Sequence, residues 1–403
     1  MKVERVPGPW RLARLVMGVA FALAGTQGRA DAQEATRPAA PPPAAVKAQA
    51  DPNPFRHINF GVTLEGYYQW NGNEPYDRVT PLRAYDTRAN TFGLQQTAIL
   101  IESAPDVAAG RRFGARVDLQ FGQATAALQG SPANEPRPEL YRNIWQAYGT
   151  YVFPVGRGLQ TDFGKFASNL GYETNYAKDN HHFSRAYLFN FLPYYHTGVR
   201  VTLPVHDRVT LMYMLTNGIQ QTEEFNDFKS SHVTAIVTPM TGVSWTVSYY
   251  AGREQPDNAE PGGPDGVFRV IDSYVNWAAS PALALALDVN HTTNQVNQVD
   301  DARSTTGLGA YARYQVAPAS ALALRYEYLD DEGLFGGIDQ QLQEVTATYE
   351  HRLADGFLVR GEYRRDWSHE AYFTGPVPGD QRRAQDTFTV GLVWWFGNKS
   401  GSW

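Results

Sequence analysis

Apolar and polar residues alternate strictly along much of this chain. The stretch "RFGARVDLQFG", residues 112–122, has apolar side chains at every second position and small, polar or charged ones between them. A period of two is typical of a β-strand whose two faces meet different surroundings. In a soluble sheet a core covers the apolar face, yet no helical pattern follows these strands to provide one. The alternation therefore predicts a sheet whose apolar face the chain leaves uncovered.

From residue 57 onward the pattern predicts 16 strands. They lie near 57–70, 90–102, 112–122, 142–153, 159–166, 194–205, 208–217, 230–238, 243–252, 267–278, 282–293, 305–316, 321–330, 340–352, 357–367 and 385–396. Two of them are irregular, because the alternation is weak in 90–102 and slips phase near Val270 and Ile271, where a β-bulge is expected.

The predicted connections sort by length. Those after odd strands are long, up to 27 residues in 167–193, whereas those after even strands are short and carry turn residues such as Ala354-Asp355-Gly356. An outer-membrane barrel has tight turns at its periplasmic end and long loops outside. In lipid only a helix or a closed barrel satisfies every backbone polar group. The sequence thus predicts an all-β fold, a transmembrane up-and-down antiparallel β-barrel of about 16 strands.

The first 54 residues differ from the rest. Residues 1–32 combine a basic start, an 11-residue apolar stretch and an A-x-A site, which predicts a signal peptide that directs export through the inner membrane. Residues 33–54 are rich in Ala and Pro and predict a disordered periplasmic tether. The outer-membrane barrel is expected to occupy residues 55–403.

Composition narrows the function classes. The chain has no cysteine, so neither disulfides nor thiolate sites are possible. Aromatic residues make up 13% of the chain, as the girdles of a membrane barrel require. The formal net charge is −6, and residues 1–32 carry more basic than acidic residues, so the remainder is more acidic still. This balance disfavours nucleic acid as a partner.

Six stretches carry characteristic patterns of strand and turn residues. They are "GYYQWNGNEP" (66–75), "LRAYDTRANTFGLQQTAILIE" (82–102), "GARVDLQFG" (114–122), "DFGKFASNLGYE" (162–173), "YYHTGVRVTLPV" (194–205) and "GLVWWF" (391–396). They resemble the β-barrel porin-2 family of OmpL-like porins. The resemblance covers nearly all of 55–396. It implies a location in the cell outer membrane and passive solute passage, without indicating a solute. Barrels of this class usually finish on an aromatic of the last strand, here Phe396, but "GNKSGSW" follows it.

The longest connection, 167–193, is the candidate constriction. It carries Lys178, His181, His182 and Arg185 among aromatic residues, and long loops without regular structure are usually functional. An external cap that merely shields the mouth is the alternative. Four residues flank the loop and are further candidates for narrowing the pore: Asp162, Lys165, His196 and Arg200. Unperturbed imidazoles here would titrate near pH 6–7.

The alternation of the two strand faces also assigns charged residues to the bore. The predicted pore-lining residues are Glu65, Arg116, Asp118, Asp288, Arg313, Arg325, Glu327, Arg360, Glu362 and Arg364. Opposed charges across a channel would create a transverse field suited to polar solutes. Plain solvation of these side chains, with neutralising pairs among them, is the simpler reading.

The expected function is an outer-membrane porin that forms a water-filled channel for passive diffusion of small hydrophilic solutes. Its expected partners are outer-membrane lipid and those solutes, with the oligomeric state open. No cofactor is expected, and no metal site, because adjacent residues such as His181 and His182 point apart on a strand. An enzyme is not expected: Ser184 and Ser231-His232 are the serines nearest histidines, and neither has a recognisable context. A barrel with a structural, anchoring or hydrolase role is the alternative.

Overall fold

A computed structural model describes residues 57–129, 135–255, 266–296 and 301–403. They belong to one compact unit, Arg56–Trp403. The predicted signal peptide, 1–32, and the predicted tether, 33–54, lie outside the described residues.

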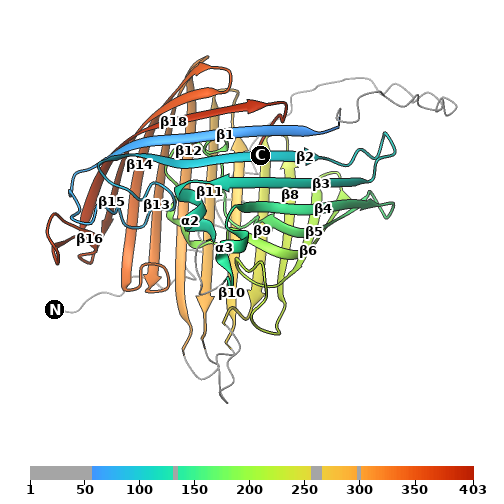
Figure 1. Ribbon diagram of the computed structural model, residues 1–403, viewed down its shortest axis with the longest axis horizontal. Coiled ribbons are helices and arrows are strands. Elements are labelled where there is room, and N and C mark those ends of the chain that lie inside the picture. Colours follow the sequence, from blue (N-terminus) through green and yellow to red (C-terminus); the bar gives the residue numbers. More distant parts are fainter. Residues whose placement is uncertain (1–56, 130–134, 256–265, 297–300) are drawn as a thin grey trace. The chain divides into compact units, whose positions relative to one another are not determined.

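Sixteen strands form the wall of a closed barrel, and all correspond to the strands predicted from the alternation (Figure 1). They are β1 (Asn59–Asn71), β2 (Thr91–Ser103), β3 (Phe113–Phe121), β4 (Ile144–Phe153), β5 (Leu159–Ala167), β6 (Tyr195–His206), β7 (Val209–Thr216), β8 (Ser230–Met240), β9 (Val243–Gly252), β10 (Phe268–Ala278), β11 (Leu283–Asn294), β12 (Arg303–Ala317), β13 (Ser320–Glu332), β14 (Asp339–Ala354), β15 (Phe357–Ser368) and β18 (Ala384–Gly397).

Every neighbouring pair of strands is antiparallel, and each strand pairs with the next one along the chain. The ring closes where β1 pairs with β18, from Gly61 opposite Gly397 to Asn71 opposite Thr387. Closure leaves no free sheet edge, so every strand has two hydrogen-bonded neighbours. The even number of barrel strands places the start of β1 and the end of β18 at the same end, the one with the short turns.

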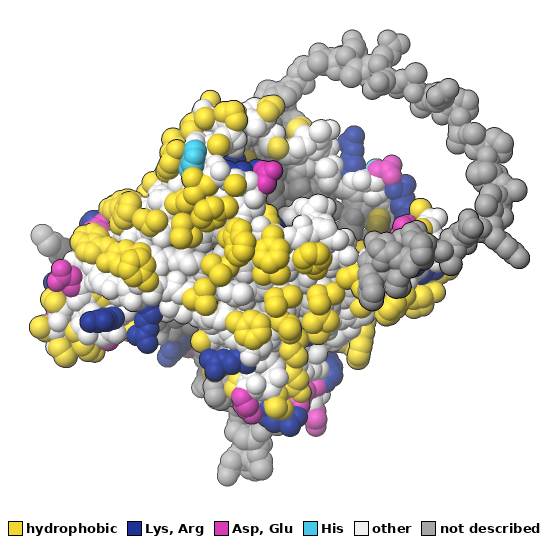
Figure 2. Space-filling view, turned by 45° about the horizontal axis from the view of Figure 1, so that its top comes forward, with side chains coloured by type: hydrophobic (Ala, Val, Ile, Leu, Met, Phe, Trp, Pro, Cys, Tyr) yellow, Lys and Arg dark blue, Asp and Glu magenta, His cyan; other side chains and the backbone are white. Residues whose placement is uncertain are grey.

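Side chains alternate between the two faces of the wall as predicted. In β3, Phe113, Val117 and Phe121 are exposed on the outer face, whereas Asp118 and Gln120 are buried on the inner one. The space-filling view shows hydrophobic side chains spread over the outer surface, with few charged ones among them (Figure 2). An apolar exterior of this kind is what lipid requires.

The long connections carry structure of their own. The segment after β3 contains helices α2 (Gln123–Gln129) and α3 (Pro138–Tyr141), and the segment after β5 contains the 3₁₀ turn η2 (Ala177–Asp179) and helix α4 (Tyr187–Phe191). A small hairpin, β16 (Phe373–Thr374) with β17 (Gln381–Arg382), lies between β15 and β18. None of the helices in the described part of the chain is long and apolar enough to span a membrane.

The two irregular strands have different explanations. In β2 the register shifts opposite Glu65 and Gly66, and both Gln95 and Gln96 are buried, so a bulge explains the weak alternation there. The bulge expected near Val270 and Ile271 is wrong, because β10 pairs with β9 and β11 without interruption. Val270 simply faces inward.

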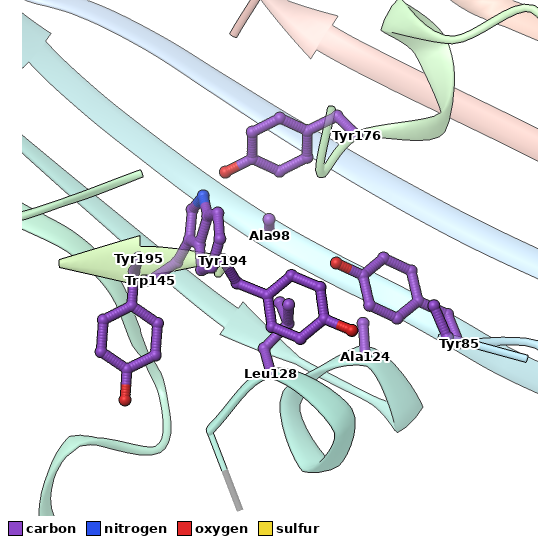
Figure 3. Packing of buried hydrophobic residues seen from close by; sticks show 9 residues of the cluster. Tyr85, Ala98, Ala124, Leu128, Trp145, Tyr176, Tyr194 and Tyr195 are labelled. Atoms are coloured by element: carbon purple, nitrogen blue, oxygen red, sulfur yellow. The ribbon is translucent and has the colours of Figure 1, made fainter. Parts of the chain in front are cut away.

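Apolar packing lies inside the barrel, between the wall and the long connections. Val270 packs with Leu170, Leu192 and Tyr250, and Leu170 and Leu192 belong to the segment between β5 and β6. A larger cluster joins the walls of β2, β4 and β6 to three different connections (Figure 3). Its members are Tyr85, Ala84, Ala98, Ala124, Leu128, Trp145, Tyr176, Tyr194 and Tyr195. Inward-facing apolar residues are therefore covered by chain that enters the bore.

Candidate functional site

The connection between β5 and β6, residues 168–194, lies in the bore and is called the inward loop below. Seven of its backbone N–H groups donate to carboxylates on the inner wall. Glu362 and Glu327 each accept from two neighbouring N–H groups. Phe183 and Ser184 donate to Glu362 over 2.7 and 3.1 Å. The remaining five are Tyr187 and Leu188 to Glu327, Ala177 to Glu65, Gly171 to Asp272 and Tyr172 to Asp288. These carboxyl groups accept the loop's N–H groups over 2.7–3.1 Å, so they fix the loop.

Arginines of the wall hold the carbonyl groups of the same loop. Arg360 donates to the carbonyl oxygens of Ala177, Asn180 and His182 over 2.5–2.9 Å. Arg325 and Arg364 donate to the carbonyls of Ser184 and Arg185, over 3.0 and 2.8 Å. A guanidinium presents several donors in a rigid fork, which suits it to irregular backbone. Acids on β1, β10, β11, β13 and β15 and arginines on β13 and β15 thus pair with much of the loop's main chain.

The wall charges also pair with one another. Arg325 contacts Glu344 at 2.7 Å and Glu173 of the inward loop at 2.8 Å. Arg360 contacts Glu350 at 2.7 Å, and Arg364 contacts Asp366 at the same distance. Buried charges need such partners, because desolvation without one costs several kcal/mol. The network is therefore mostly neutralised within itself.

The ten predicted pore-lining residues all lie on the inner face, but most are shut off from water. Eight are no more than 1% exposed: Glu65, Asp118, Asp288, Arg325, Glu327, Arg360, Glu362 and Arg364. The side chains of Arg116 and Arg313 keep 10% and 24% exposure. The eight buried residues contact the inward loop or one another. A role for any of the ten in conduction stays a prediction.

The four predicted loop residues have different surroundings. The guanidinium of Arg185 donates to the carbonyls of Thr174, Asn175 and Phe183, so it holds the loop's own turn. Lys178 pairs with Asp179 at 2.9 Å and is 5% exposed in its side chain. His181 and His182 point apart, to the hydroxyls of Tyr172 and Thr348 respectively.

The histidines of the loop do not titrate where a free imidazole would. Burial, followed by the charges of Arg313 and Arg360, lowers the pKa of His181 to about 4. Burial likewise holds the pKa of His182 well below its usual value, aided by Arg325. Both imidazoles are therefore neutral at pH 7. The titration near pH 6–7 expected from unperturbed histidines is wrong for this pair.

The four flanking residues lie on β5 and β6, where Asp162 and Arg200 pair and Lys165 and His196 have separate partners. Asp162 accepts from Thr150 at 2.6 Å and from Arg200 at 2.7 Å, and Arg200 stacks 4.5 Å from the ring of Phe166. Lys165 lies 3.9 Å from the ring of Tyr195 and donates to Gln129 of α2. His196 bonds the Gly218 carbonyl and the Ser168 hydroxyl, 3.1 and 3.2 Å away. Of the four, Arg200 alone keeps a partly exposed side chain, at 15%.

Sequence reasoning missed two further inward segments. Arg83, between β1 and β2, is 5% exposed and donates to Thr387 over 2.6 Å and to Asp366 over 3.3 Å. Helix α2 buries Ala124 and Leu128 against Ala98 of β2. Apolar residues at inward positions, such as Leu100, Leu329 and Leu358, could have indicated these segments. A bore filled only with water would not favour apolar side chains there.

No catalytic arrangement was found around the serines considered from the sequence. Ser184 bonds Arg325, and Ser231 bonds Tyr213 on the outer face while its neighbour His232 points inward. Among the described residues no group of three or more His, Cys, Asp or Glu side chains is placed to hold a metal ion.

Solved structures share this architecture. An anion-selective porin from Comamonas acidovorans aligns with a TM-score of 0.55 at 11% identity, covering 84% of this chain and 98% of that one. In-vitro folded OmpT of Vibrio cholerae, in its trimer form, gives 0.55 at 12% identity, with coverages of 84% and 99%. OprB of Pseudomonas putida gives 0.54 at 10% identity, with coverages of 84% and 94%. At such low identity these likenesses establish the fold alone.

Among curated proteins, none matches this chain. A family model, described as "Putative beta-barrel porin-2, OmpL-like", matches residues 57–396, which cover all of the barrel wall except its last residue, Gly397. The match agrees with the closed 16-stranded barrel. The chain belongs to this family of OmpL-like β-barrel porins and is an outer-membrane porin.

Proposed function

We propose that this porin passes small hydrophilic solutes passively and that the inward loop sets its narrowest section. The observation that carries the proposal is the clamping of the loop's main chain. Five wall carboxylates on β1, β10, β11, β13 and β15 accept its N–H groups. A loop held on so many strands is a fixed part of the passage, so it limits what can pass.

Solute preference would depend on the few charges that still meet water. Arg116, Arg200 and Arg313 keep 10–24% of their side chains exposed. Glu102 and Glu350 keep 13% and 11%, so acids as well as arginines meet water, whereas the fully buried acids pair with arginines or accept from the loop. The field across the bore is then weaker than the count of charged residues suggests. Such a passage favours small polar solutes without a strong demand for one sign of charge.

The tight filling of the bore also favours a second candidate, a barrel with a structural or anchoring role. Each of the 16 strands contributes an inward side chain that is at most 5% exposed. They are Glu65, Leu100, Asp118, Gln146, Asp162, His196, Met214, Thr234, Ser248, Asp272, Asp288, Tyr311, Arg325, Thr346, Glu362 and Thr389. An anchor would pass no ions, whereas a narrow porin would pass them in small steps.

Single-channel recording in planar bilayers tests the proposal. The wild type should give small, steady current steps. A Glu327→Ala/Glu362→Ala variant releases four loop N–H groups from the wall and should give larger, noisier steps. Asp386→Ala is the matched control, because this exposed carboxylate pairs with Arg365 and Tyr363 and does not contact the loop.

Two results would count against the proposal. A wild type that folds yet carries no current would favour the anchoring role. Equal conductance in the wild type and the double variant would mean that the inward loop does not set the narrowest section. Deleting 174–185 provides an independent check, since removing this part of the loop should raise conductance several-fold.

A further inference from the structure

The chain turns back into the bore after β18 ends. Asn398 caps this turn, since its side-chain oxygen accepts the Phe60 N–H at 2.7 Å, and the N–H groups of Asn398 and Lys399 donate to the Phe60 carbonyl. Gly397 has φ of +135°, and a Cβ there would collide with that carbonyl oxygen. Only glycine suits such a conformation, so the reversal of direction is built into the sequence. Residues 398–403 are called the return segment below.

A charged pair ties the return segment to the inner wall. The ammonium of Lys399 lies 2.6 Å from Oε2 of Glu102, and both side chains are less than 20% exposed. Glu102 stands near the short-turn end of β2 and also faces Arg116 at 3.8 Å. The segment thus starts against the same inner face that carries the bore charges.

Trp403 reaches the tip of the inward loop. Its backbone N–H donates to Asp179 over 3.0 Å, and its ring meets the ring of Tyr176 edge-on at 5.8 Å. Lys178 lies 4.5 Å from the indole ring and donates to the carbonyl of Gly401 over 3.0 Å. Aromatic and cation–π contacts of this kind add to simple burial.

The wall leaves a space for this indole at Gly61. A Cβ built on Gly61 would stand 2.5 Å from the Trp403 ring, closer than real side chains approach. Gly61 faces inward on β1 and forms the end pair of its ladder with β18, opposite Gly397. The indole therefore lies between the barrel wall and the loop tip at 176–179.

We propose that the return segment is a second narrowing element of the channel, which enters from the short-turn end and holds the tip of the inward loop in place. This inference rests on the proposed function, in which the inward loop sets the narrowest section. The loop enters from the long-loop end and the return segment from the opposite end, so their contact braces the obstruction from both sides. Trp403 is the residue that positions the loop tip.

A cysteine pair tests the placement directly. The chain has no natural cysteine, so in an Asp179→Cys/Trp403→Cys variant only the introduced pair can be cross-linked. The 3.0 Å contact between the Trp403 nitrogen and the Asp179 carboxylate puts the two positions within reach of a disulfide or a short bis-maleimide. We expect a cross-link in the folded barrel and none in the urea-unfolded protein. Absence of the link in the folded barrel would overturn the inference, whether or not the protein conducts.

Single-channel conductance tests whether the return segment narrows the channel. Reducing the cross-linked variant should raise its single-channel current by roughly two-fold and increase its open-channel noise, and reoxidation should reverse both. Trp403→Ala should behave like the reduced form. Gly61→Leu leaves the return segment unchanged but occupies the space of the indole, so it should increase the noise as well. Gly361→Leu is the control, because nothing lies within 4 Å of a Cβ at that outward position.

The outcomes separate this inference from the proposed function. A cross-linked, folded protein that carries no current would defeat the proposed function and leave the placement of Trp403 established. Currents that are identical in the oxidised and reduced variant, and in Trp403→Ala, would defeat the return segment as a narrowing element. Faster migration of unboiled than of boiled samples on gels confirms that each variant is folded.

Discussion

At the residue scale, one arginine shows how charge is used inside this barrel. Arg185 resembles a selectivity residue in the sequence, since it is a cation in a long loop. In the structure its guanidinium donates to three loop carbonyls and lies 3.9 Å from Glu65. Its side chain is fully buried, so it shapes the loop and does not meet the solute directly.

Replacing Arg185 by alanine should therefore act on stability. The change removes the side-chain donor to the Asn175 and Phe183 carbonyls and the cation beside Glu65, and breaking such a buried pair costs about 3–5 kcal/mol. Urea unfolding followed by gel mobility would measure the loss. Arg352→Ala is the control, because Arg352 is exposed and its removal should change the free energy of unfolding by less than about 0.5 kcal/mol. Equal midpoints for the two variants would contradict the structural role of Arg185.

His181 of the inward loop gives a pH prediction of definite sign. His181 has a pKa of about 4 in the folded protein, below the ordinary value of 6.5 that it regains on unfolding. The unfolded chain thus binds a proton between these values that the folded chain does not, and stability falls as pH drops from 6.5 toward 4. Arg313 and Arg360 lower this pKa further, and Glu350 opposes them.

Urea midpoints at pH 7.5 and pH 4.5 measure this effect. The drop should be smaller in His181→Gln, which keeps a polar partner for Tyr172 and has no imidazole to protonate. The same drop in both proteins would show that His181 stays neutral in the unfolded chain or is charged in the folded one.

At the element scale, the two faces of each strand should respond differently to charge. Leu285 lies on the outer face of β11, opposite Ala312 and Trp277. Leu285→Arg puts a cation on the lipid-facing surface at the third residue of β11 and should cost about 1–3 kcal/mol, because the penalty falls from about 2–4 kcal/mol at the bilayer midplane toward the interface. Alternation alone would offer Asn290 as the bore-facing control, but Asn290 is 1% exposed beside Gly307, where Leu188 packs.

Asn276 is the better control for this comparison. It faces inward on β10 and is partly exposed, so Asn276→Arg should cost little. The yield of heat-modifiable protein in membranes, together with urea midpoints, would measure both variants. Similar losses for Leu285→Arg and Asn276→Arg would contradict the assignment of faces.

The strands of the barrel wall could be predicted from the sequence, whereas the packing of the segments inside the bore could not. Alternation and turn residues depend on local chemistry, so they located all 16 strands and the inner position of Glu65, Arg325 and Glu362. The bulge expected at Val270 was wrong because an inward apolar residue was read as a slip of phase. Its partners, Leu170 and Leu192, come from the inward loop, and contacts between such distant segments leave no periodic signal.

At the scale of the whole molecule, the closed wall and its clamped interior should unfold together. The inward loop is hydrogen-bonded to five strands, and Arg83 ties the first connection to β15 and β18.

We expect the protein to fractionate with outer membranes and to migrate faster on gels when unboiled than when boiled. Recovery in the soluble periplasmic fraction after gentle lysis would contradict the membrane barrel.

The contact between Trp403 and Gly61 has a consequence for the order of assembly. Pairing of β1 with β18 joins Gly61 to Gly397, which are separated by nearly the whole barrel sequence, and such distant pairings are slow to form. Trp403 contacts both β1 and the tip of the inward loop. It therefore reaches its final surroundings only after β1 has paired with β18 and the inward loop has entered the bore. Burial of the Trp403 indole thus marks a completely assembled barrel, and in a barrel that has not closed the indole would be exposed to water.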